Sequence, residues 1–184
     1  LIENLAASIY KQGEEAGRRG DSKTAAQNFL RVAQAAPTST IRPAADYDAA
    51  AALIQLKDWG GAASVLTAFR NNHPGHKLQA EVTKKMAQQT MTQLLLLEGE
   101  GDADIKMFIN SPGGDADAGF AIYDMMRFVK PRIKAVCAGV AASAAVIILL
   151  GAEKENRFSL SNARVLIHQP STGIHGTAAD IQIE

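Results

Sequence analysis

The chain has 184 residues, a length that suits one domain or two small ones, and 47% of them are hydrophobic, enough for a core. Nineteen basic and nineteen acidic side chains balance, so no overall charge favours nucleic acid or an anionic membrane surface, and we expect neither partner. The one cysteine, Cys137, lies in an apolar run and fits a reducing, cytoplasmic location. The start at Leu1 rather than Met indicates a trimmed or partial product, so targeting information is expected to be absent.

The first half of the chain, residues 1–88, is rich in Ala and Gln at helical spacing and has no β-branched runs. Turn residues break it at Gly20-Asp21, Pro37 to Pro43, Trp59-Gly60-Gly61 and His73-Pro74-Gly75. These breaks predict helices over residues 2–18, 22–36, 44–57, 61–72 and 76–98.

A repeat is visible in this helical half, because Pro37 and Pro74 each follow a predicted helix and lie 37 residues apart. Small or apolar residues recur before each proline in three pairs: Ala25 and Ala62, Phe29 and Leu66, Gly13 and Ala50. The pattern resembles about two copies of the tetratricopeptide repeat with a three-residue insertion, although Ile9 and Asp46 replace the usual first-helix aromatic residue. The resemblance implies stacked helix pairs that bind a peptide or a protein partner. A generic pair of helical hairpins is the alternative.

From about residue 89 strands and helices alternate. We predict strands at 105–109, 133–138, around Phe158 and at 165–167, a turn at 111–114, and helices over 118–129 and 142–150. This order predicts an α/β fold with a largely parallel sheet. The uncharged run from Ala135 to Ala152 reaches the lower limit of a membrane span, but its strongly apolar part is only Val146 to Leu150. A buried strand and a buried helix explain the run better.

Two residues have the placement that acyl transfer requires. Ser143 precedes a predicted helix, and His168 follows a predicted parallel strand, so both are expected at the same sheet edge. Gly113 and Gly114 follow another strand at that edge, where backbone N–H groups can approach a reacting carbonyl.

Four groups of residues in this half occur in the order and spacing of the proteolytic subunit of the caseinolytic protease, ClpP. They are Phe108-Ile109-Asn110-Ser111-Pro112-Gly113-Gly114, Ala121-Ile122-Tyr123-Asp124, Ala141-Ala142-Ser143-Ala144, and Asn162-Ala163-Arg164 with Ile167-His168-Gln169-Pro170. Residues 89–184 therefore resemble this family.

The resemblance implies a crotonase-like fold with Ser143 as nucleophile and His168 as general base. It assigns the oxyanion-hole N–H groups to Gly114 and Ala144, and substrate binding to Gly113, Thr172, Gly173 and Ile174. Residues 172–176 would form a strand beside the substrate channel, and residues 178–184 the start of the helix through which two rings meet. It also implies peptide or unfolded-protein substrates, a homo-oligomer and an AAA+ Clp ATPase partner.

The chain also departs from the family. Ser143-Ala144-Ala145-Val146 replaces the usual Ser-Met-Gly-Ala, and the family's aspartate lies beyond Glu184, so the triad role is not assigned to Asp180. We expect a serine protease core that is truncated at both ends. Loss of a triad acid costs about 10⁴ in turnover, so the chain alone would be slow or inert. A non-catalytic scaffold, or a recombined chimera joined through helix 76–98, is the alternative.

The remaining polar residues indicate no metal or cofactor. His73 and His76 flank a turn without the additional Cys or carboxylate ligands of a metal site. Asp115 and Asp117 are expected to cap the helix after the glycine turn.

Overall fold

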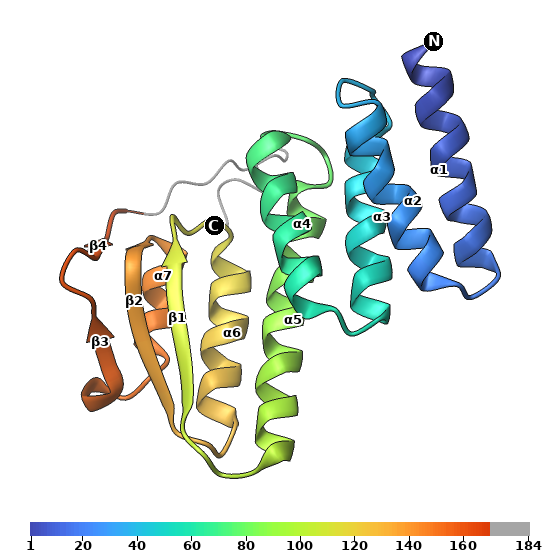
Figure 1. Ribbon diagram of the computed structural model, residues 1–184. Coiled ribbons are helices and arrows are strands. Elements are labelled where there is room, and N and C mark those ends of the chain that lie inside the picture. The colour runs from blue at the N-terminus through green and yellow to red at the C-terminus, as the bar shows by residue number, and fades with distance from the viewer. Residues whose placement is uncertain (170–184) are drawn as a thin grey trace, which may run out of the picture. The chain divides into compact units, whose positions relative to one another are not determined.

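The computed structural model describes residues 1–169. By its internal contacts the chain divides into two compact units, Leu1–Leu96 and Leu97–Glu184 (Figure 1). The first unit is helical, and the second alternates strands and helices. The sequence-based division at residues 88 and 89 remains a prediction.

Five helices were predicted for the first half, and five are present: α1 (Ile2–Arg18), α2 (Ser22–Ala35), α3 (Arg42–Gln55), α4 (Trp59–Asn72) and α5 (Gln79–Glu100). The predicted starts of α3 and α4 were two residues late. Pro43 lies in the first turn of α3, where its missing N–H is tolerated. Trp59-Gly60-Gly61 was wrongly taken as a break, because Asp58 caps α4 and these residues form its first turn.

The helical unit repeats itself after 37 residues. Helix α4 begins and ends 37 residues after α2, and α3 ends 37 residues after α1. The caps repeat as well: Asp21 Oδ1 accepts a hydrogen bond from Thr24 N at 3.0 Å, and Asp58 Oδ1 accepts one from Gly61 N at 2.9 Å. The first helix of each pair ends with equivalent bonds, from Asp21 N to Ala16 O and from Asp58 N to Leu53 O, both 3.0 Å. Helices α1 to α4 therefore form two equivalent helix pairs.

Close helix crossings hold each pair together. In the first pair the Phe29 ring lies on Gly13, where a Cβ atom would fall 2.6 Å from Phe29 Cε1. The corresponding positions in the second pair, Ala50 and Leu66, are both fully buried in one cluster with Val82 of α5. The smaller Leu66 side chain leaves room for the Ala50 methyl group.

Within its described part, the second unit contains a four-stranded parallel sheet. Its elements are β1 (Ile105–Ser111), α6 (Ala116–Phe128), β2 (Ile133–Ala142), α7 (Ala144–Leu150), the short 3₁₀ helix η1 (Lys154–Asn156), β3 (Arg157–Ser159) and β4 (Arg164–Leu166). Strand β2 is central: β1 pairs along one edge of it, and β3 and β4 pair in succession along the other. Lys134 Nζ donates to Asp104 Oδ2 at 2.7 Å and ties together the starts of β1 and β2.

Strand β2 extends four residues beyond the predicted end at residue 138, and α7 starts at Ala144 rather than 142. The reason is tertiary pairing, because Val140, Ala141 and Ala142 pair with β4 and Ala141 also pairs with Ser111 of β1. The uncharged run from Ala135 to Ala152 is thus a strand followed by a short helix. Within residues 1–169, no helix is long and apolar enough to cross a membrane.

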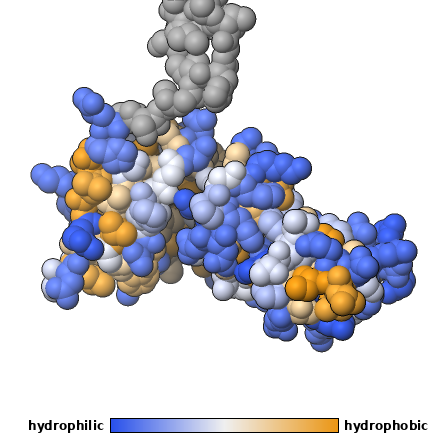
Figure 2. Space-filling model, turned by 90° about the horizontal axis from the view of Figure 1, so that it is seen from above, coloured by the Kyte–Doolittle hydropathy of each residue, from blue (hydrophilic) through white to orange (hydrophobic). Residues whose placement is uncertain are grey.

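Alternate residues of the strands are buried on one face of the sheet: Ile105, Ile109, Ile133, Ala135 and Cys137. Helix α7 contacts β1 and β2, and α6 packs against α7. On the other face Phe108, Val136 and Phe158 lie in register across three strands. Phe108 is 66% exposed and Phe158 46% exposed. In the space-filling view, hydrophobic patches lie among the hydrophilic residues of the surface (Figure 2).

Candidate active site

Ser143 is the single residue between β2 and α7. Its backbone has φ 54° and ψ −124°, a left-handed conformation that residues with a side chain rarely adopt. Both of its backbone polar groups are bonded: Ser143 N donates to Leu166 O at 3.0 Å, and Ser143 O accepts from Val146 N at 2.9 Å. Ser143 is half-buried in this sharp turn, whereas its two neighbours, Ala142 and Ala144, are buried.

The glycine turn after β1 packs directly against this serine. A Cβ atom on Gly113 would fall 2.4 Å from Ala142 O, 2.8 Å from Ser143 Cβ and 3.0 Å from Ala144 N. Gly113 and Gly114 have φ values of +88° and +142°, which glycine adopts without strain. Gly113 N donates to Ser111 Oγ at 3.1 Å. The predicted turn is present, and it places glycine backbone beside Ser143.

The two residues predicted as oxyanion donors border the same turn. Ala144 is the first residue of α7, a position whose N–H has no acceptor within its own helix. Gly119 of α6 packs on Ala144, since a Cβ atom there would lie 3.3 Å from Ala144 Cβ. Gly114 is exposed next to Asp115, whose carboxylate caps α6 by accepting from Ala118 N at 2.8 Å, as predicted. Asp117 lies in the first turn of α6.

His168 follows β4 by two residues and is exposed. Because Ala142 pairs with Leu166 and Ser143 N bonds Leu166 O, the chain that leads to His168 runs beside Ser143. Within residues 1–169 no hydrogen bond joins the Ser143 hydroxyl to the His168 ring. His168 Nδ1 lies 2.6 Å from Gln169 O. A carbonyl oxygen only accepts, so Nδ1 carries the hydrogen, and Nε2 of the neutral ring is the acceptor a general base requires.

Asn110 supports the site and was not singled out from the sequence. The β1–β2 register breaks between Ile109 and Ser111, so that three residues of β2 stand opposite Asn110. Asn110 Oδ1 accepts a hydrogen bond from Val140 N at 3.1 Å and would lie 2.6 Å from a Cβ atom on Gly139, which has φ +111°. The amide thus closes a β-bulge four residues before Ser143. Gly139 within an apolar strand was the available signal, because glycine there often marks a bulge.

Three predicted substrate residues, Thr172, Gly173 and Ile174, lie outside the described residues, as do Asp180 and the segments 172–176 and 178–184. His73 pairs with a carboxylate of the helical unit, its Nε2 lying 3.0 Å from Asp46 Oδ2. Across residues 1–169 no three His, Cys, Asp or Glu side chains are grouped as metal ligands.

The geometry fits acyl transfer at Ser143. Ser143 lies in a strained turn, glycine backbone lies against it, and α7 with its unpaired first N–H groups starts at the next residue. A histidine with Nε2 as acceptor follows the neighbouring strand.

The family model described as Clp protease matches residues 74–184. ATP-dependent Clp protease proteolytic subunit 2 of Treponema denticola is 50% identical over 107 residues, which cover 58% of this chain and 54% of that protein. A mutant of ClpP1 from Listeria monocytogenes superposes with a TM-score of 0.50 at 48% identity, covering 55% of each chain. For ClpP1 of the same organism the TM-score is 0.48 at 47% identity, covering 54% of this chain and 58% of that one.

The match therefore spans about half the length of the curated relative. The family model covers α5, the glycine turn, the Ser143 turn and the strand before His168. Because the family model matches more than half of the chain, this chain belongs to the Clp protease family.

Proposed function

We propose that the second unit is a serine peptidase of the Clp type, in which Ser143 is the nucleophile and His168 the general base. The observation that carries the proposal is the left-handed Ser143 turn held against the Gly113 backbone. The match of residues 74–184 to the Clp protease family model and the 48% identity to a ClpP1 mutant of known structure support it.

In this mechanism the Ser143 hydroxyl attacks the carbonyl carbon of a peptide bond, and His168 Nε2 takes its proton. The N–H groups of Gly114 and Ala144 stabilise the negative charge that develops on the carbonyl oxygen. His168 then returns the proton to the leaving amine, and water releases the acyl group from Ser143. Gly113 and the strand at 172–176, with Thr172, Gly173 and Ile174, would hold the peptide. The substrate class is peptides and unfolded proteins, and the functional state is a homo-oligomer that works with an AAA+ Clp ATPase.

Hydrolysis of a fluorogenic peptide tests this role. We expect the chain to hydrolyse the peptide slowly, Ser143→Ala to abolish hydrolysis, and His168→Ala to lower the rate by about 10²-fold or more, the usual contribution of a general base. Ser161→Ala changes an exposed serine in a turn of the same unit and serves as the matched control. Hydrolysis that persists unchanged in Ser143→Ala would contradict the proposal.

For the first unit we propose a tetratricopeptide-like repeat that binds a peptide segment of a protein partner. The specific support is the 37-residue repetition of helix bounds, caps and crossings in the two helix pairs. The single chain would thus join a binding unit to a peptidase unit. If the second unit does not hydrolyse peptides, the binding and scaffold role of the first remains a separate function.

A further inference from the structure

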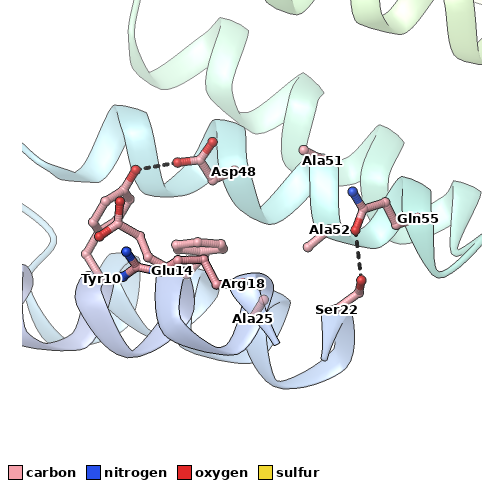
Figure 3. Close-up of a pocket in the computed structure, with 11 residues that line it drawn as sticks. Tyr10, Glu14, Arg18, Ser22, Ala25, Asp48, Ala51, Ala52 and Gln55 are labelled. Carbon is pink, nitrogen blue, oxygen red and sulfur yellow. Dashed lines mark hydrogen bonds between the residues drawn. The ribbon is translucent and has the colours of Figure 1, made fainter. Parts of the chain in front are cut away.

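The helical unit contains a cavity of about 410 Å³ between α1 and α3. Its floor is apolar: Ala25 and Phe29 of α2 and Ala52 of α3 line it, and each is at most 6% exposed. Figure 3 shows α1 and α3 on opposite sides of this space, with side chains of both helices directed toward it. An apolar floor of this kind accommodates the hydrocarbon part of a ligand.

The walls of the cavity carry charged groups in a definite order. Tyr10, Glu14 and Arg18 stand on successive turns of α1, and Asp48 of α3 lies opposite Tyr10 (Figure 3). Tyr10 Oη donates a hydrogen bond to Asp48 Oδ2 at 2.5 Å. At the other end Ser22 Oγ donates to Gln55 Oε1 at 2.8 Å. The cavity therefore has an acidic end with Glu14 and Asp48, and the Arg18 side chain extends along α1 toward that end (Figure 3).

At the acidic end of the cavity, Tyr10 remains a protonated hydrogen-bond donor to Asp48. Burial raises the pKa of the Tyr10 phenol, and the hydrogen bond to Asp48 and the charges of Asp48 and Glu14 raise it further. The phenol thus stays protonated and keeps donating to Asp48. A neutral donor adds no charge, so the two carboxylates of Glu14 and Asp48 outnumber the single cation of Arg18 in the cavity wall.

We infer that this cavity binds a lysine or arginine side chain of a peptide segment, with its aliphatic stem on the floor and its cation between Glu14 and Asp48. The inference deepens the proposed binding role of the helical unit and rests on it. Long basic side chains combine an apolar stem with a charged end, which matches a floor of Ala25, Phe29 and Ala52 below two carboxylates. Hydrogen bonds between a cation and a carboxylate are among the stronger ones, and they would fix the orientation of the peptide.

Titration of the ¹⁵N-labelled full chain with two blocked alanine pentapeptides tests this assignment. One peptide has a central arginine, and the other has citrulline, which has the same shape without the charge. We expect saturable shifts of the Gly17, Ser22 and Gln55 amides with the arginine peptide, and binding weaker by about tenfold with citrulline, since hydrogen bonds to charged groups contribute about 1.5–3 kcal/mol.

Four variants separate charge from shape. Glu14→Gln and Asp48→Asn should each weaken arginine binding by about tenfold, whereas Arg18→Gln should strengthen it because a like charge is removed. Glu15→Gln alters an exposed carboxylate of the same helix outside the cavity and should have no effect. Because Glu14 is exposed and takes no part in the Tyr10–Asp48 hydrogen bond, Glu14→Gln removes a charge from the cavity without breaking that bond.

Each remaining outcome overturns the inference. Equal binding of both peptides would leave a peptide-binding role but refute recognition of a cation. Shifts confined to amides away from the cavity, or no saturable shift with either peptide, would refute the site itself. The peptidase proposal is tested separately at Ser143.

Discussion

Gly113 lies so close to Ser143 that a Cβ atom on Gly113 would fall 2.8 Å from the Cβ atom of Ser143. The same Cβ atom would lie 2.4 Å from Ala142 O, which is backbone and cannot rotate away. The glycine turn and the serine turn therefore pack directly against each other. Any side chain at position 113 must displace one turn from the other.

We expect Gly113→Ala to slow the reaction of Ser143 with a fluorophosphonate by about a hundredfold, because small displacements of catalytic groups have costs of this size. Labelling rates measured by mass spectrometry, with circular dichroism as a check on folding, decide the point. Gly20→Ala is the control, because Gly20 has a similar φ of +78° but nothing within 4 Å of the added methyl group. Equal rates for both variants would show that contact with Ser143 is unimportant.

Asn110 gives a second test of the geometry. Replacing Asn110 with Ala removes the acceptor for Val140 N and loosens the bulge before Ser143. Labelling should slow by about tenfold, because a hydrogen bond between neutral groups contributes about 0.5–1.5 kcal/mol. Asn110→Asp keeps an oxygen that can accept from Val140 N and should retain most of the rate. If the Asp variant is as slow as the Ala variant, the hydrogen bond is not the reason that Asn110 matters.

Much of this architecture could be predicted from the sequence because its signals are local. Gly20-Asp21 and His73-Pro74-Gly75 bound the helices on either side of them, and the run Ile105 to Ile109 with the residues that follow it identified the first strand and the glycine turn. The end of β2 could not be predicted, because Val140 to Ala142 are strand through pairing with β4 and not through local preference. The role of Asn110 was missed for the same reason, since its partner Val140 lies 30 residues away.

The cavity was also beyond the sequence. Tyr10 and Asp48 are 38 residues apart and face each other only because α1 and α3 lie on opposite sides of the cavity. A helical repeat indicates that such helices are neighbours, but it does not say which polar side chains meet.

Two glycines of α1 should respond oppositely to substitution. Gly13→Ala places a methyl group 2.6 Å from the buried Phe29 ring, and overpacking of this kind costs about 1–3 kcal/mol, more than the gain in helix propensity of about 1 kcal/mol. Gly17→Ala meets only Ala25 Cβ, at 3.9 Å, and should stabilise the chain by about 0.5–1 kcal/mol.

Urea unfolding of the full chain measures both changes. Adding Phe29→Leu to Gly13→Ala should recover part of the loss, because Leu66 occupies the equivalent place opposite Ala50 in the second helix pair. If Gly13→Ala is as stabilising as Gly17→Ala, α1 and α2 do not cross as closely at Gly13 as described above.

Glu3 should make the stability of the helical unit depend on acid pH. Hydrogen bonds from Thr40 N and then Ser39 Oγ hold the pKa of the Glu3 carboxyl below its usual value of 4.5. A carboxyl with a lowered folded-state pKa contributes stability above its unfolded-state pKa and loses it as the pH falls through the folded-state value. The wild-type chain should therefore have the higher unfolding temperature at neutral pH, with its advantage over Glu3→Gln shrinking below pH 4.5.

Thermal unfolding of both proteins from pH 7 to about pH 3 tests this. The matched control is Glu15→Gln on the same helix, whose carboxylate has no hydrogen bond or ion pair within residues 1–169. A Glu3→Gln difference that stays constant across this range would contradict the assigned hydrogen bonds.

The most direct test of the peptidase proposal is the intact mass of the native chain after reaction with a fluorophosphonate. We expect one adduct per chain, located on the peptide that contains Ser143, absent from Ser143→Ala and formed more slowly by about 10²-fold or more in His168→Ala. No adduct on the native chain, or the same adduct on Ser143→Ala, would contradict the assignment of Ser143 as the nucleophile.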